Sequence, residues 1–149
     1  MNITERKPSK IAFSLSIRDY REEDYSLIEA IWQKVEMTPF TQTELRRLLA
    51  VEGRALVAEI IGSQHQIVGV VLWSHNGRSA MLWRLAVDPD FHGKGIGKAL
   101  VRRAENDIRE LGFEQAGLLV KDNNEAAKSL YSKSDYADRS MEYWSKNLG

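Results

Sequence analysis

Apolar residues recur along the chain with two different periods, and the changes between them predict a series of helices and strands. Residues 22–35 carry apolar side chains at i, i+3, i+4 and i+7, the spacing of one helix face. Pro39 interrupts this pattern, and residues 41–49 then predict a second, shorter helix. The longest helix is predicted over 96–111, followed by Gly112 as a natural C-terminal stop. Its expected inward face consists of Ile96, Leu100, Ala104, Ile108 and Leu111.

Strands are predicted where apolar residues cluster in short runs between turn residues. These runs cover residues 15–20, 55–61, 66–73, 79–87, 115–120 and 141–144. Asn76-Gly77 is a strong hairpin turn signal, so the three middle strands should be antiparallel neighbours. A last helix is expected over 124–132, which gives the order β-α-α-β-β-β-α-β-α-β. This order predicts an α+β domain built around a sheet.

Composition narrows the class of protein. The 149 residues suit one domain, and 43% hydrophobic with 28% charged residues is ordinary for a soluble globular protein. Lysine plus arginine total 21, as do aspartate plus glutamate, so the formal net charge is zero. The chain therefore lacks the excess positive charge that nonspecific nucleic-acid binding requires. We expect residues 1–14 to form a flexible leader and residues 15–149 to form a single domain.

Missing residue types and segments exclude several kinds of chemistry. The absence of cysteine excludes disulfides, thiolate metal sites and a cysteine nucleophile, and it fits a cytoplasmic protein. His65, His75 and His92 show no HxxxH spacing, so no metal is expected. No apolar stretch approaches about 18 residues, and the first ten residues lack an apolar segment, so neither a membrane span nor a secretory signal is expected.

The most informative segment is a glycine-rich turn between a predicted strand and the longest predicted helix. It reads His92-Gly93-Lys94-Gly95-Ile96-Gly97-Lys98. Backbone N–H groups at a helix N-terminus lack intrahelical acceptors, and the helix dipole favours a negative charge beside them. Glycine also lets the backbone approach a phosphate closely. The turn therefore predicts a cradle for a pyrophosphate, against the alternative that its glycines serve packing alone.

Two familiar nucleotide motifs do not fit this turn. The P-loop pattern GxxxxGK[ST] is absent, and the dinucleotide pattern GxGxxG differs from the spacing of Gly93, Gly95 and Gly97. The acidic residue that the dinucleotide pattern requires about 20 residues later is also missing. A nucleotide-binding domain is therefore a weak alternative.

The turn and its surroundings resemble the acyl-CoA pyrophosphate loop of the GNAT superfamily of N-acetyltransferases. That loop has the pattern Q/R-x-x-G-x-G/A, and His92 stands at its first position here. The Ala-Val-Asp-Pro sequence at 86–89 and the run Asn124-x-x-Ala127-x-x-x-Tyr131 are also typical of the family. The resemblance covers about residues 15–147. It implies a GNAT-like fold, with a mixed, mostly antiparallel central sheet flanked by helices.

The resemblance also implies an activity and a set of site residues. The protein would be an acetyl-CoA-dependent N-acetyltransferase that moves acetyl directly to a primary amine of a small molecule, peptide or protein. Tyr131 would protonate the leaving thiolate, since a phenol with a pKa of about 10 is protonated at neutral pH. Asn124 would cap the last helix, contact the coenzyme, or do both. The implied cofactor-binding residues are Leu85, Ala86, Val87, His92, Gly93, Lys94, Gly95, Ile96, Gly97, Lys98 and Asn124.

The general base is not visible in the sequence. Glu59 and His75 are candidates on the second and third strands, each weighed against an ordinary surface role, and a water chain is the third option. The usual catalytic glutamate of the subgroup that acetylates protein N-termini falls at Leu119, so neither that base nor that substrate is carried over.

The acceptor is equally undetermined. Residues 36–40, with Trp83 and Arg84, are expected to shape its pocket. The expected partners are acetyl-CoA, an unidentified amine and a second copy in a homodimer, without nucleic acid or membrane. The alternative function is a non-catalytic acyl-CoA-binding regulatory module, since no base is apparent.

Overall fold

The computed structural model describes residues 13–62 and 64–149. All but the last two residues of the expected leader, 1–14, lie outside this part. The chain forms two compact units, one ending at Leu119 and one spanning Val120–Gly149. No helix among the described residues is long and apolar enough to cross a lipid bilayer.

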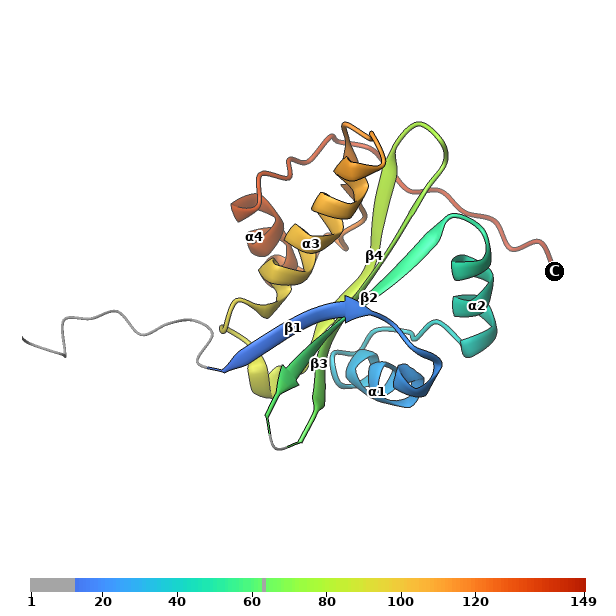
Figure 1. Ribbon diagram of the computed structural model, residues 1–149. Helices are drawn as coiled ribbons and strands as arrows, with labels where there is room; N and C mark the ends of the chain where they lie inside the picture. Colours follow the sequence, from blue (N-terminus) through green and yellow to red (C-terminus); the bar gives the residue numbers. More distant parts are fainter. Residues whose placement is uncertain (1–12, 63) are drawn as a thin grey trace, which may run out of the picture. The chain divides into compact units, whose positions relative to one another are not determined.

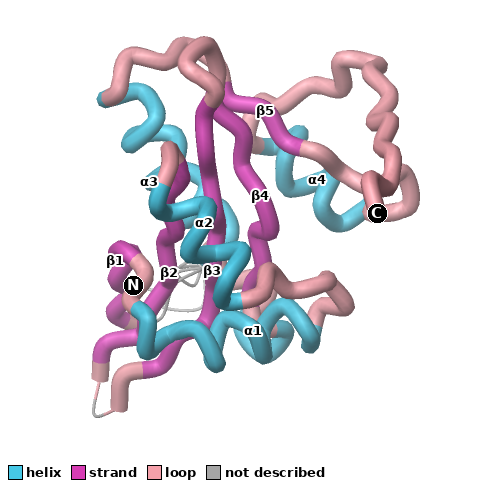
Figure 2. Tube along the Cα trace, turned by 90° about the vertical axis from the view of Figure 1, so that its right-hand side faces the viewer, coloured by secondary structure: helices cyan, strands magenta, loops and turns pink. Residues whose placement is uncertain are grey.

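The first unit is built on a five-stranded sheet in the order β1-β2-β3-β4-β5. Figure 2 shows these strands side by side; the first four pair antiparallel, and β4 and β5 pair parallel. The predicted mixed, mostly antiparallel sheet and the α+β class are therefore confirmed. The strands are β1 (Ser14–Asp19), β2 (Gly53–Ile61), β3 (Gln66–His75), β4 (Ala80–Val87) and β5 (Ala116–Leu118).

Three helices cover this sheet, with α1 and α2 against one face and α3 against the other (Figure 1). They are α1 (Tyr25–Lys34), α2 (Gln42–Ala50) and α3 (Ile96–Glu110). The first predicted helix begins as a separate 3-10 turn, Glu22–Asp24. A capping box starts α2, because the Thr41 hydroxyl accepts from the Glu44 N–H while the Glu44 carboxylate accepts from the Thr41 N–H.

The core lies on both faces of the sheet. On one face Trp32, Leu45 and Leu72 are completely buried, and on the other α3 contributes four of its five expected inward residues. Leu111 is the exception, because the helix ends before it and its side chain is 57% exposed. The central strand β3 is buried on both sides from Ile67 to Trp73, so its sequence is a nearly continuous apolar run without clear alternation.

The second unit contains one helix, α4 (Glu125–Lys133), and an extended C-terminal segment. The prediction of a last strand at 141–144 was wrong, and no strand follows α4 in the part of the chain that is described. Ser140 adopts a left-handed conformation with φ 56°, and its N–H donates to the Asp138 carboxylate at 2.7 Å. This local turn breaks the extended backbone just before the apolar residues, which remain exposed.

Candidate active site

Strand β4 separates from β5 partway along its length. The pairing ends at Leu82 opposite Leu118, whereas β4 continues to Val87. Beside β3 the register shifts, so that Arg84 and Leu85 both lie opposite the single residue Val71. This is a β-bulge, and Arg84 occupies it with φ 52°, in the left-handed region. The last residues of β4 therefore have an edge that β5 does not cover.

The backbone at this open edge is available to an extended ligand. The Asp88 N–H donates to the Val68 carbonyl on β3 at 2.8 Å. Because backbone groups alternate between the two edges of a strand, those of Val87 face away from β3. The Val87 carbonyl lies 2.8 Å from Nε2 of His92. By the same alternation, the backbone groups of Leu85 also face away from β3, whereas Ala86 pairs with Val70 on β3.

The glycine-rich turn follows this edge and leads into α3. Gly93 has φ 76°, and Gly95 has φ 83° at the N-cap of the helix. A Cβ at Gly93 would meet no atom within 4 Å, so the positive φ, and not crowding, calls for glycine there. The N–H groups of Ile96, Gly97 and Lys98 donate to no acceptor within the described chain. They form a set of adjacent hydrogen-bond donors at the helix N-terminus.

Side chains around the turn hold it in place. His92 joins the turn to β4 through the Val87 carbonyl. Asp88 is buried, accepts from the Asp90 N–H at 3.0 Å, and lies 3.0 Å from Nζ of Lys34 on α1. Burial alone would raise the pKa of Asp88, but the Asp90 N–H and the Lys34 ammonium hold it below its usual value. The ion pair therefore holds the residue that precedes the turn, Asp88, against α1.

The cations near the turn divide into two groups. Arg103 donates to Asp107 at 3.1 Å and to the Ile17 carbonyl at 3.0 Å, so it fastens α3 to β1. No side-chain hydrogen bond engages Lys94 or Lys98 within the described residues, and Lys98 is exposed. These two lysines are therefore cations that an anion at the turn could recruit.

The loop between α1 and α2 is fixed to the bulge. The Arg84 carbonyl accepts from Nε1 of Trp32 at 2.9 Å, and Nε of Arg84 donates to the Thr38 carbonyl at 3.0 Å. The Arg84 guanidinium also lies 5.7 Å from the centre of the Phe40 ring. The structure thus brings the predicted acceptor segment 36–40 to Arg84. No sequence signal marks Arg84 as a bulge residue, because arginine rarely adopts positive φ.

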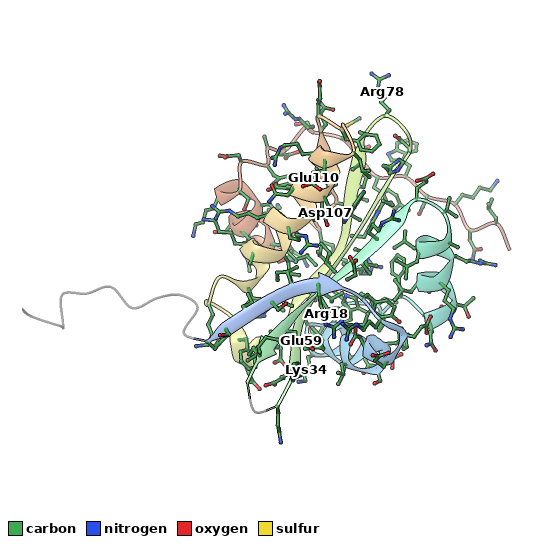
Figure 3. All side chains as sticks on the ribbon, in the orientation of Figure 1. Arg18, Lys34, Glu59, Arg78, Asp107 and Glu110 are labelled. Atoms are coloured by element: carbon green, nitrogen blue, oxygen red, sulfur yellow. The ribbon has the colours of Figure 1, made fainter. Side chains whose placement is uncertain are left out.

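Glu59 is already engaged by other side chains. Its carboxylate lies 3.1 Å from Nη2 of Arg18 on β1 (Figure 3). The same carboxylate lies 3.3 Å from Nδ1 of His65. The Arg18 hydrogen bond holds the pKa of Glu59 below its usual value against the smaller, opposing effect of burial, and the His65 hydrogen bond lowers this pKa further. A carboxylate held ionised in this way is a poor proton acceptor at neutral pH.

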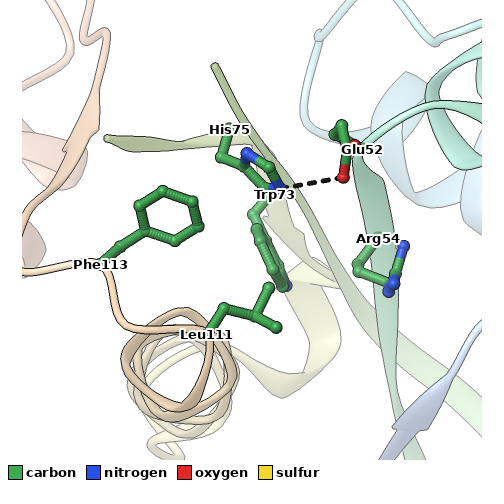
Figure 4. Close-up of a pocket in the computed structure, with 6 residues that line it drawn as sticks. All are labelled: Glu52, Arg54, Trp73, His75, Leu111 and Phe113. Atoms are coloured by element: carbon green, nitrogen blue, oxygen red, sulfur yellow. Dashed lines mark ion pairs between the residues drawn. The ribbon is translucent and has the colours of Figure 1, made fainter. Parts of the chain in front are cut away.

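His75 is also fully engaged. Its Nδ1 accepts from the Gly77 N–H at 3.1 Å, and its Nε2 lies 3.0 Å from the Glu52 carboxylate (Figure 4). An Nδ1 that accepts a hydrogen bond carries no proton, so Nε2 holds the proton that points to Glu52. Neither ring nitrogen offers a free lone pair. His75 lies at the hairpin end of β3, five residues along β4 from Leu85, or about 17 Å.

Two predicted site residues, Asn124 and Tyr131, belong to the second unit. The Asn124 side chain accepts from the Ala127 N–H at 3.0 Å and so caps α4. Tyr131 packs edge-on against Tyr136, with ring centres 5.8 Å apart. Burial raises the pKa of Tyr131 to about 12.

Known proteins are similar to this chain in sequence and in fold. The sequence matches the acetyltransferase (GNAT) family over residues 15–136. The acetyltransferase ECA0875 of Pectobacterium atrosepticum is 31% identical over 126 residues, which cover 82% of this chain and 87% of that protein. The acetyltransferase plu1384 of Photorhabdus laumondii is 29% identical over 132 residues, which cover 86% and 90% of the two chains.

Solved structures share the fold at lower identity. The PaiA N-acetyltransferase of Thermoplasma acidophilum, in complex with coenzyme A, has a TM-score of 0.67 at 23% identity, covering 81% of this chain and 88% of that one. The aminoglycoside acetyltransferase meta-AAC0020 from a soil metagenomic sample, in complex with sisomicin, has a TM-score of 0.72 at 21% identity, covering 91% and 97%. The chain belongs to the acetyltransferase (GNAT) family and is an acetyl-CoA-dependent acetyltransferase.

Proposed function

We propose that this enzyme transfers acetyl directly from acetyl-CoA to a primary amine. The observation that carries the proposal is the set of unengaged N–H groups of Ile96, Gly97 and Lys98, beside the open edge of β4. The diphosphate of the coenzyme would accept from the N–H groups of 93–98, with Lys94 and Lys98 nearby. Its pantetheine arm would pair with the backbone of Leu85 and Val87 as an added strand.

The bulge in β4 supports a position for the thioester. At Arg84 and Leu85 the strand turns away from regular pairing with β3. A backbone N–H at the bulge would polarise the thioester carbonyl, where negative charge develops as the amine attacks. His92 would have to share the Val87 carbonyl with the pantetheine amide or move away from it.

The chemistry requires one proton to be removed and one to be supplied. The neutral amine nitrogen attacks the thioester carbonyl carbon, the carbon–sulfur bond breaks, and the departing thiolate takes a proton. Tyr131 is the proposed donor, and its pKa of about 12 supports a phenol that keeps its proton at neutral pH. Glu59 and His75 both have hydrogen-bond partners already. We therefore propose that a chain of water molecules removes the proton from the incoming ammonium group.

Replacing Tyr131 with phenylalanine tests the assignment. Tyr131→Phe removes only the phenol oxygen, so we expect kcat to fall about 100-fold while the Kd for coenzyme A changes less than about twofold. Thiol release gives the rate, and calorimetric titration gives the Kd. In the wild type, the rate should show no loss between pH 7 and 10, because the phenol stays protonated there. An unchanged kcat in the variant would contradict the role of Tyr131.

A non-catalytic acyl-CoA-binding module predicts a different outcome. Such a protein would bind coenzyme A and release no thiol with any amine in a broad panel. We further propose a cytoplasmic location and a homodimer, as expected from the sequence. Cell fractionation and light scattering of the purified protein test these two points.

A further inference from the structure

A hollow of about 340 Å³ lies between α2, the start of β2 and the hairpin end of β3, and Phe40 connects it to the bulge. Phe40 lines it, and the same ring lies under the Arg84 guanidinium. Ser74 lines it as well, and the Ser74 hydroxyl accepts from Nε1 of Trp83, the residue directly before Arg84. Phe40 and the Ser74–Trp83 hydrogen bond thus connect the hollow to the proposed reaction point. Its volume falls within the range of roughly 300–1,000 Å³ for small-molecule sites.

Apolar side chains form much of the lining. Phe40, Leu48 and Val51 contribute an aromatic ring and two aliphatic side chains. Val51 stands at the C-cap of α2 and is 73% exposed. Leu48 also packs against the core, so the wall it forms is held in place. An apolar wall of this kind favours a ligand with an apolar body, since burying that body against it is favourable.

The carboxylates of the lining already have partners within the protein. Glu52 lies 3.0 Å from Nε2 of His75. Glu44 accepts from the Thr41 N–H at 2.8 Å, and the hydrogen bonds of Thr41 hold the pKa of Glu44 below its usual value. Arg47 adds a positive charge to the same lining. The hollow therefore offers no unpaired carboxylate cluster for a polyamine or an aminoglycoside.

We propose that the acceptor is a monoamine with an aryl or alkyl body, an arylalkylamine being the simplest case, and that this body occupies the hollow while its amine lies toward the bulge at Arg84. This inference rests on the proposed function, because it names the acceptor class of the same site. It assigns Phe40, Leu48 and Val51 as the residues that determine specificity.

A panel of three amines tests the class. With acetyl-CoA, we expect kcat/KM for 2-phenylethylamine to exceed that for spermidine and for kanamycin by about tenfold or more, because only its ring gains from the apolar wall. Equal values, or a preference for either polycation, would overturn the inference while leaving acetyl transfer to amines intact.

Direct binding separates the inference from the proposed function. Calorimetric titration of 2-phenylethylamine into the protein saturated with coenzyme A should show one site. If the amine binds but no thiol is released with acetyl-CoA, the proposed function fails and the assignment of the hollow stands. If the amine does not bind, the assignment of the hollow fails.

A matched pair of surface variants locates the site. Val51→Lys places a hydrated ammonium at the rim, so KM and Kd for 2-phenylethylamine should rise about tenfold, with kcat within about twofold. Leu27→Lys is the control, because Leu27 is 49% exposed on α1 and does not line the hollow. It should leave KM, Kd and kcat unchanged. Equal effects of the two variants, or none from Val51→Lys, would overturn the assignment.

Discussion

Asp24 shows how one buried carboxylate joins the first strand to the first helix. It accepts from both terminal nitrogens of Arg18, at 2.8 and 2.9 Å, and from the Arg21 N–H at 2.8 Å. Burial alone would raise the pKa of Asp24, but these donors together hold it below its ordinary value. The sequence shows a charged residue before an amphipathic helix, and nothing in it indicates that the carboxylate is buried.

Replacing Asp24 should reveal this contribution to stability. A carboxyl whose pKa is lowered by folding stabilises the protein above its unfolded pKa of about 3.9, and the effect is lost as pH falls through the lower folded pKa. We expect Asp24→Asn to reduce the free energy of unfolding by about 3 kcal/mol at pH 7. Urea unfolding at pH 7 and at pH 3 should show the difference shrinking in acid.

The exposed pair of Glu22 and Arg46 provides the control for this experiment. Glu22 accepts from Nε of Arg46 at 3.0 Å, and the side chains are 52% and 60% exposed. Water screens such a pair, so Glu22→Gln should change stability little. Equal losses in the two variants, or a loss from Asp24→Asn that does not depend on pH, would contradict the account of Asp24.

At the scale of elements, the turn before α3 was predictable because it depends on local backbone chemistry. Glycine spacing, a preceding strand and a following amphipathic helix together indicated an anion cradle. The bulge at Arg84 was not predictable, because its left-handed conformation is imposed by contacts with Trp32 and Thr38, which lie 52 and 46 residues away in sequence.

Gly93 and Gly62 make a matched test of the turn. A Cβ at either position would meet no atom within 4 Å, but only Gly93 has a positive φ, of 76°. Gly93→Ala should strain or shift the turn, at a cost of roughly 1–2 kcal/mol, and weaken coenzyme A binding about tenfold or more. Gly62→Ala should leave the Kd unchanged. Calorimetric titration of both variants measures this, and an unaltered Kd in Gly93→Ala would show that the turn does not hold the coenzyme.

At the scale of the whole molecule, the sequence predicted the order of elements better than the contacts between them. Periodicity and turn residues indicated four helices and five strands that the structure contains. The strand expected at 141–144 was wrong because the alternation of apolar residues there is not matched by a pairing partner, and Ser140 turns the chain.

The candidate site was predicted only in its local parts. The backbone of 85–87 and the turn 93–98 follow from motif and resemblance, since each lies in one stretch of sequence. The contacts that hold these segments in position join residues that are far apart in the sequence. Lys34 and Asp88 are 54 positions apart, and Arg103 and Ile17 are 86 positions apart. The hollow lined by Leu48, Val51 and Ser74 likewise exists only after folding, and no pattern in the sequence indicates it.

The central claim is that backbone N–H groups of the turn and of the open β4 edge hold coenzyme A. The most direct test is a titration of the ¹⁵N-labelled protein with coenzyme A, followed by amide chemical shifts. The account predicts that the largest shifts fall on 93–98 and on Leu85 and Val87, with 53–61 nearly unchanged. Saturable binding whose largest shifts lie elsewhere, with the amides of 93–98 unmoved, would contradict it.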